Sequence, residues 1–264
     1  MRGGAPGALL IDIDGVVLKD DEPLPGARDL VSWLLSSERR FLFLTNFPSQ
    51  TPADLATRLA ASGLAVPPSH FVTSAMATAE FLDRQAGPHR RAFVVGEGAL
   101  VHELYKVGFT ISETDADFVV LGETRHYNFE MIQRAAALIR RGARFIATNP
   151  DVAGPAGRPG CGALAAPIER MTGKSPFCVG KPSAFMMRAG LRHLESHSAE
   201  AWMVGDNMET DIIAGVQSGM TTVLVLTGVS READLPRFAH RPDHVVADAF
   251  ALRDLLETGA SSPG

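Results

Sequence analysis

The chain has few cysteines, no long apolar run and no excess of positive charge. Its 264 residues include two cysteines, Cys161 and Cys178, too few for a disulfide framework and typical of a reducing compartment. We expect both to be small buried apolar residues rather than nucleophiles. No apolar run approaches the roughly 20 residues that cross a bilayer, and no signal-peptide core develops before Asp12. These absences predict a cytoplasmic protein.

The charge balance also limits the partners. The formal net charge is -5, which gives no general attraction to nucleic acid polymers or to anionic membranes. An anionic substrate would therefore need local positive charge or a metal ion. The length, with 45% hydrophobic and 21% charged residues, predicts one large or two modest globular domains. We expect a small-molecule substrate and a monomer or small homo-oligomer.

Short apolar runs alternate along the chain with segments of helical periodicity. We predict strands at 8–13, 40–44, 92–95, 118–121, 144–147, 201–204, 222–226 and 244–246. We predict helices at 26–36, 52–62, 75–84, 99–107, 128–141, 182–197, 209–218 and 249–257. Strand–helix alternation with nearly continuous apolar strands predicts an α/β fold with a Rossmann-like parallel sheet.

Two aspartates follow the first apolar run. Asp12 and Asp14 point to the same side if the strand continues that far, and Gly15 then lets the chain turn. Buried carboxylates need a cation or a proton to compensate them, and Mg²⁺ beside a phosphate is the usual partner. The alternative is an ordinary Asp-Gly turn with solvated carboxylates, and this stretch alone does not decide between them.

Polar residues at other strand ends favour the first interpretation. Thr45-Asn46 ends the second strand, Asp206-Asn207 ends the strand at 201–204, and Lys181 opens the helix before that strand. Ligands of parallel sheets gather at the carboxyl ends of the strands. Phosphoryl transfer needs a nucleophile, a cation, donors to the phosphoryl oxygens and a proton for the leaving group, and this set can supply all four.

Each of these residue types has a chemical use in that reaction. Asp12 can be the nucleophile and Asp14 the general acid and base. The Thr45 hydroxyl and the Asn46 amide can donate to the phosphoryl group, and Lys181 supplies a fixed positive charge.

The segment after 205 adds ligands for both a metal ion and an anion. Asp206 offers a carboxylate to Mg²⁺, and Asp211 follows closely. Asn207, Met208, Glu209 and Thr210 would open a helix whose free N–H groups favour an anion.

The motifs Asp-Ile-Asp-Gly-Val (12–16), Leu-Thr-Asn (44–46), Gly-Lys-Pro (180–182) and Gly-Asp-Asn-Met-Glu-Thr-Asp-Ile (205–212) resemble the four motifs of the haloacid dehalogenase superfamily of phosphatases. The chain is most similar to its NagD-like nucleotide phosphatases. That resemblance runs through residues 45–50, 73–79, 94–100, 122–125, 145–151, 161–164 and 225–230.

The resemblance implies Mg²⁺-dependent hydrolysis of nucleoside monophosphates such as UMP or GMP, with sugar phosphates as an alternative. It implies that Asp12 is nucleophile and Mg²⁺ ligand, that Asp14 is the acid/base and gives its backbone carbonyl to the metal, and that Asp206 binds the metal. It also implies that Thr45, Asn46, Lys181 and residues 207–210 hold the substrate.

Lys181 lies 136 positions after Thr45, which leaves room for an inserted domain where this superfamily carries its type 2 caps. We predict a core of residues 1–87 and 179–264 and an α/β cap of residues 88–178. A non-catalytic sensor of a phosphorylated ligand is the hypothesis from another class, although a pure binder needs neither Asp12 nor Asp14. His193 and His197 are four residues apart, but we expect them on a solvated helix face.

Overall fold

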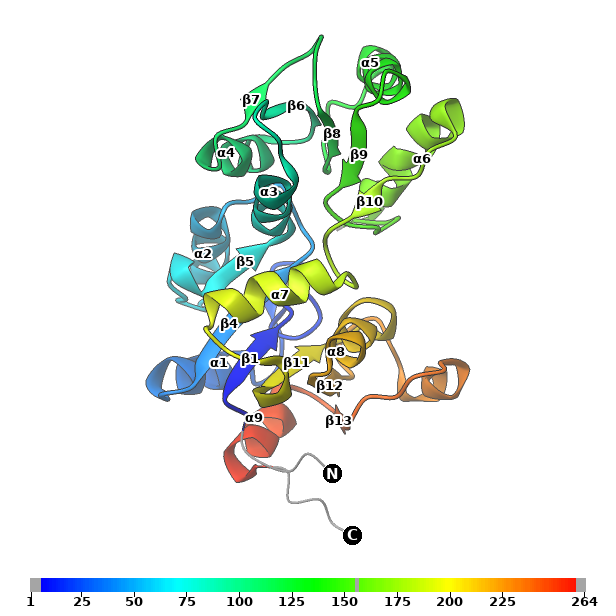
Figure 1. Ribbon diagram of the computed structural model, residues 1–264. Helices are drawn as coiled ribbons and strands as arrows, with labels where there is room; N and C mark the ends of the chain where they lie inside the picture. The colour runs from blue at the N-terminus through cyan, green and yellow to red at the C-terminus, as the bar shows by residue number, and fades with distance from the viewer. Residues whose placement is uncertain (1–5, 155–156, 260–264) are drawn as a thin grey trace. The chain divides into compact units, whose positions relative to one another are not determined.

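The computed structural model describes residues 6–154 and 157–259, and it divides into two compact units. The described residues of the first unit are 6–45, 52–72 and 187–259. Those of the second unit are 46–51, 73–154 and 157–186. Each has its own parallel sheet (Figure 1). The predicted boundaries at 87/88 and 178/179 differ from this division and stay a prediction.

The first unit is built on a six-stranded sheet in the order β13-β12-β11-β1-β4-β5. Its strands are β1 Ala8–Ile11, β4 Arg40–Thr45, β5 Phe71–Thr73, β11 Ala201–Gly205, β12 Thr221–Val225 and β13 His244–Val246. The central strand β1 pairs in parallel with β11 and β4, with Ile11 opposite Val204 and Phe43. The carboxyl ends of these three strands therefore lie at one edge of the sheet.

Alternation along the strands sends side chains to two apolar layers. Leu9, Ile11 and Val204 pack in a buried cluster with helices α1 Ala27–Ser36, α2 Pro52–Ala61 and α9 Ala249–Thr258. On α7 Ala184–His193, a Cβ at Gly190 would lie 2.8 Å from Leu10 Cδ2. Both faces of β1 are thus covered, which explains its uninterrupted apolar sequence.

The second unit is built on a five-stranded sheet in the order β10-β9-β8-β6-β7, and every neighbouring pair is parallel. Its strands are β6 Arg91–Val95, β7 Thr110–Ile111, β8 Phe118–Leu121, β9 Arg144–Ala147 and β10 Phe177–Cys178. Helices α5 Phe129–Arg140 and α6 Cys161–Thr172 supply apolar residues to one cluster with β6, β8 and β9. Helices α3 Ser74–Gln85 and α4 Gly98–Lys106 contact each other.

The first strand ends two residues earlier than predicted, at Ile11 instead of Ile13. The Asp12 N–H still donates to Val204 O at 2.9 Å, but the chain then folds back on itself. The Ile13 carbonyl accepts hydrogen bonds from the amides of residues 16, 17 and 18, and Gly15 has φ +84°. Asp14 therefore lies in a tight turn, so strand alternation does not orient its side chain.

Helix α6 is the largest element that the periodicity did not predict. Gly162 and Pro167 both lie inside it, and these residues have the lowest helix propensities. The short strands β5, β7 and β10 were also not predicted, and α7 is shorter than the predicted helix 182–197. Among the described residues, no helix has the length and apolar content that crossing a bilayer requires.

Candidate active site

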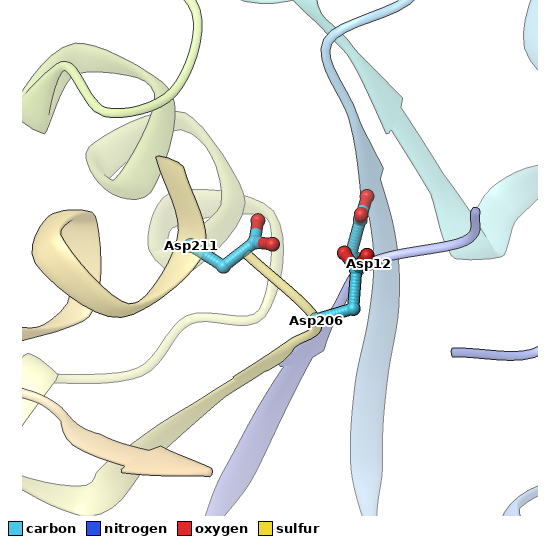
Figure 2. Close-up of side chains that lie close together, drawn as sticks. All are labelled: Asp12, Asp206 and Asp211. Atoms are coloured by element: carbon cyan, nitrogen blue, oxygen red, sulfur yellow. The ribbon is translucent and has the colours of Figure 1, made fainter. Parts of the chain in front are cut away.

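A cluster of three aspartates lies at the carboxyl edge of the six-stranded sheet. Asp12 follows β1, Asp206 follows β11, and Asp211 lies in the helical turn Met208–Ile212 (Figure 2). One carboxylate oxygen of each lies within 4.8 Å of those of the other two. Asp206 and Asp211 are buried, whereas Asp12 is half-buried.

Two glycines make room for the Asp206 carboxylate. A Cβ on Gly228 would lie 1.8 Å from Asp206 Oδ2, and a Cβ on Gly15 would lie 2.4 Å from the same oxygen. The Val229 N–H donates to Asp206 Oδ2 at 2.7 Å, and the Ser230 N–H donates to the Asp206 carbonyl at 3.0 Å. The loop after β12 thus holds both the carboxylate and the backbone carbonyl of Asp206.

Asp211 is held in the same way from the adjacent turn. Its Oδ2 accepts a hydrogen bond from the Asn207 N–H at 3.2 Å. A Cβ on Gly205 would lie 2.2 Å from Asp211 Cβ, so the last residue of β11 has to be glycine for the turn to pack this closely. The sequence motif predicted that Asp211 lies near the metal site. In the structure its carboxylate belongs to the same cluster as that of Asp206.

The donor set of this cluster fits a hard divalent cation. Two unit charges 4.8 Å apart repel by about 3.5 kcal/mol at an effective dielectric constant of about 20. Three ionised carboxylates, two of them buried, therefore need a compensating charge. Oxygen ligands of this kind are those that Mg²⁺ prefers, and the half-exposed Asp12 leaves access for a ligand.

The Asp14 carboxylate is not part of this cluster among the residues described. Its Oδ1 accepts a hydrogen bond from Arg58 Nη2 at 3.0 Å, and the side chain is 44% exposed. The sequence motifs gave no signal for Arg58, which lies on α2 and is distant from Asp14 in the chain. Thr45, the last residue of β4, is 4% exposed.

In the second unit, the Asn46 side chain binds the backbone of Lys181. Asn46 Oδ1 accepts from the Lys181 N–H at 2.7 Å, while Asn46 Nδ2 donates to the Lys181 carbonyl and to Asp151 Oδ2, each at 3.0 Å. Lys181 is 2% exposed. The Asn46 side chain thus contacts both backbone groups of Lys181, and its predicted donation to the phosphoryl group stays a prediction.

The amides of the 207–210 segment were predicted to be free for an anion, but three of them already have acceptors. The N–H groups of Asn207, Met208 and Glu209 donate to Asp211 Oδ2, Ser230 Oγ and Asn207 Oδ1. The Met208 side chain is fully buried in an apolar cluster. The segment begins with a π-helical turn rather than an α-helix, and the substrate-binding role of residues 207–210 stays a prediction.

Both cysteines belong to the second unit. Burial raises the pKa of Cys161 to about 12, so the thiol is protonated at neutral pH. Cys161 is fully buried in the second unit and Cys178 is half-buried, and both are free thiols. The prediction of a buried apolar role is confirmed for Cys161.

A second polar group follows β8 and β9 in the second unit. Burial raises the pKa of Glu123 from 4.5 to about 7, and the charge of Asp151 also raises it, although a hydrogen bond with Asn149 and the charge of Arg158 oppose the rise. Asn149 is fully buried and donates to the Asn46 carbonyl at 2.9 Å. The pKa of Glu123 therefore depends on burial and on its polar neighbours in these turns.

We expect the stability of the protein to fall as the pH rises through this pKa. Because the folded-state pKa of Glu123 is raised, the folded chain keeps the proton that the unfolded chain has lost, and stability present below about pH 4.5 is lost by about pH 7. Glu123→Gln removes the ionisation and keeps the shape. Melting temperatures of the parent and this variant between pH 4.5 and 8 should converge at low pH and diverge above it. Parallel curves would contradict the assignment.

A second prediction concerns Gly228. Gly228→Ala forces the added Cβ against Asp206, and overpacking of this kind costs about 1–3 kcal/mol. We expect a lower free energy of unfolding together with weaker binding of Mg²⁺, measured by titration calorimetry. Gly87→Ala is the matched control, because a Cβ there meets no atom within 4 Å. If Gly228→Ala binds the ion like the parent protein, Asp206 does not need the space that Gly228 leaves.

Comparison with known proteins identifies the class. Residues 9–110 match the haloacid dehalogenase-like hydrolase family, and residues 178–252 match the HAD-hydrolase-like family. The chain is 51% identical over 237 residues to the ribonucleotide monophosphatase NagD of Escherichia coli strain K12, covering 90% of this chain and 94% of that protein. It is 44% identical over 250 residues to the dihydroxyacetone phosphatase of Corynebacterium glutamicum strain R, covering 94% and 90%.

Superposition on solved structures leads to the same class of protein. NagD from E. coli K-12 superposes with a TM-score of 0.90 at 49% identity, over 93% of this chain and 98% of that one. The glycerol phosphate phosphatase Rv1692 of Mycobacterium tuberculosis, in complex with magnesium, superposes with a TM-score of 0.90 at 31% identity, over 98% and 80%. The two superpositions thus share the α/β framework of this chain. The chain belongs to the haloacid dehalogenase-like hydrolases and, within them, is a NagD-like phosphatase, which confirms the resemblance.

Proposed function

We propose that the protein is a Mg²⁺-dependent phosphomonoesterase that hydrolyses nucleoside monophosphates through an aspartyl-phosphate. The observation that carries the proposal is the cluster of Asp12, Asp206 and Asp211, whose half-exposed member is the nucleophile of the predicted motif. The 51% identity with a ribonucleotide monophosphatase supports the substrate class.

The carboxylates of Asp12, Asp206 and Asp211, with the backbone carbonyl of Asp14, would hold the Mg²⁺ ion. When bound, the ion neutralises charge on the phosphoryl oxygens. Asp12 attacks phosphorus and forms the aspartyl-phosphate as the bond to the leaving oxygen breaks, and Asp14 gives that oxygen a proton. Asp14 then takes a proton from water, whose oxygen attacks phosphorus and restores Asp12. A non-catalytic sensor would need neither the nucleophile Asp12 nor the acid and base Asp14.

The remaining predicted residues bind the phosphoryl group in this proposal. Thr45 donates through its hydroxyl, and Lys181, oriented by Asn46, supplies positive charge. We also propose that residues 88–178 select the leaving group, as the predicted cap would. The cytoplasmic location and the monomer or small homo-oligomer predicted from the sequence stay predictions.

A small sugar or polyol phosphate is the second candidate substrate. It is favoured by the 44% identity with a dihydroxyacetone phosphatase and by the superposition on a glycerol phosphate phosphatase. A panel of UMP, GMP, dihydroxyacetone phosphate, glycerol phosphates and hexose phosphates, assayed with Mg²⁺ and with EDTA, decides between the two. The higher kcat/KM for nucleotides is the expected result. Turnover that EDTA does not reduce would contradict the metal requirement, and no turnover of any ester would favour the sensor.

A further inference from the structure

Arg58 joins two carboxylates of the first unit that the chain places in different loops. Its Nη2 donates to Asp14 Oδ1 at 3.0 Å, and its Nε donates to Asp21 Oδ1 at 2.5 Å. The guanidinium is planar, permanently charged and carries its donors in a fixed fork, so the two contacts fix its plane. Burial tends to lower the pKa of Arg58, but the attraction of Asp14 and Asp21 outweighs it and the pKa is raised.

Asp21 is itself held in a defined position. It lies in the two-residue turn of the hairpin formed by β2 Leu18–Lys19 and β3 Glu22–Pro23, where Asp20 and Asp21 both have positive φ. Such a turn fixes the register of the hairpin. Ser62 follows the end of α2, four residues after Arg58. Its Oγ donates to the Asp21 carbonyl at 2.7 Å. The α2 region therefore holds the hairpin turn through two contacts.

The backbone of Asp14 is held by a β-bridge with Leu18, but this does not fix its side chain. Asp14 lies one residue before Gly15 in the tight turn after β1, and its side chain is 44% exposed. A half-exposed carboxylate in a turn has several rotamers open to it, whereas a general acid works from one orientation toward the leaving oxygen. The contact with Arg58 selects one of these orientations.

We propose that Arg58 is a positioning residue, which couples Asp14 to the hairpin turn and so sets the orientation in which Asp14 serves the leaving oxygen. This inference rests on the proposed function, because it assigns Arg58 to the acid of that reaction. It also assigns a role to the hairpin, because Asp21 accepts the hydrogen bond from Arg58 Nε. The ion pair is not needed for stability in this account, since partly exposed pairs contribute little.

The test is a double-mutant cycle on two substrates. Arg58→Ala should lower kcat for UMP by about tenfold or more, a part of the 10²–10⁴-fold that general acid catalysis supplies. It should lower the rate of nitrophenolate release in the first turnover of p-nitrophenyl phosphate much less, because nitrophenolate leaves without a proton. In an Asp14→Asn background, Arg58→Ala should have almost no further effect, since the group that it positions is absent.

Two controls separate positioning from a general loss of structure. Arg253→Ala removes another partly exposed arginine ion pair of the first unit, to Glu257, and should leave both substrates unaffected. All variants should melt within about 4 °C of the parent protein. Asp21→Asn should give a smaller loss with the same substrate contrast.

The outcomes are distinguishable. If the parent protein hydrolyses no phosphate ester, the proposed function fails. If the parent is active but the effects of Arg58→Ala and Asp14→Asn multiply, or Arg58→Ala affects both substrates equally, the positioning role is overturned while the phosphatase assignment stands.

Discussion

Asp12→Asn is expected to abolish turnover, with a loss in kcat of roughly 10⁴-fold or more. The substitution replaces the attacking carboxylate with an amide of the same shape, so the covalent route has no nucleophile. It also removes one negative ligand from the cluster with Asp206 and Asp211. Substrate affinity should fall less than the rate, or should rise, because the repulsion between the carboxylate and the phosphoryl oxygens is lost.

The measurement is single-turnover hydrolysis of UMP with saturating Mg²⁺, together with substrate binding by calorimetry. Acid quench of the parent enzyme should trap phosphate on the protein, and Asp12→Asn should trap none. Turnover within tenfold of the parent rules out the covalent route. Loss of substrate binding in proportion to the rate would instead assign Asp12 to binding.

The strands that position this chemistry could be predicted because they are buried on both faces. The apolar runs at 8–11, 41–44 and 201–204 are continuous, and β1 pairs with both of the other strands in the structure. Each run ends in polar residues, so the sequence brought Asp12, Thr45 and Asp206 to one edge. The glycines at 15, 205 and 228 leave the space that Asp206 and Asp211 occupy, a requirement that appears only when the loops are in place.

Side-chain partners across different loops could not be predicted in the same way. The pairing of Arg58 with Asp14 depends on where α2 packs, and one arginine on an amphipathic helix carries no motif. The acceptor of the Met208 amide depends likewise on the return of the chain at Ser230. The contacts of Asn46 with Lys181 could not be predicted from the motif, because an amide that fits a phosphate oxygen also fits a backbone N–H and carbonyl.

Asp14→Asn is expected to slow transfer of the phosphoryl group from UMP to Asp12 by about 10²–10⁴-fold, and to slow the same step with p-nitrophenyl phosphate much less. The ribose oxygen of UMP leaves as a basic alkoxide and needs a proton as its bond breaks, whereas nitrophenolate does not. Asp14 also prepares water for the second step, so its loss makes hydrolysis of the aspartyl-phosphate slow. With p-nitrophenyl phosphate, the variant should therefore release a rapid burst of nitrophenolate followed by slow turnover. Equal loss on both esters with no burst would show that Asp14 is not the acid.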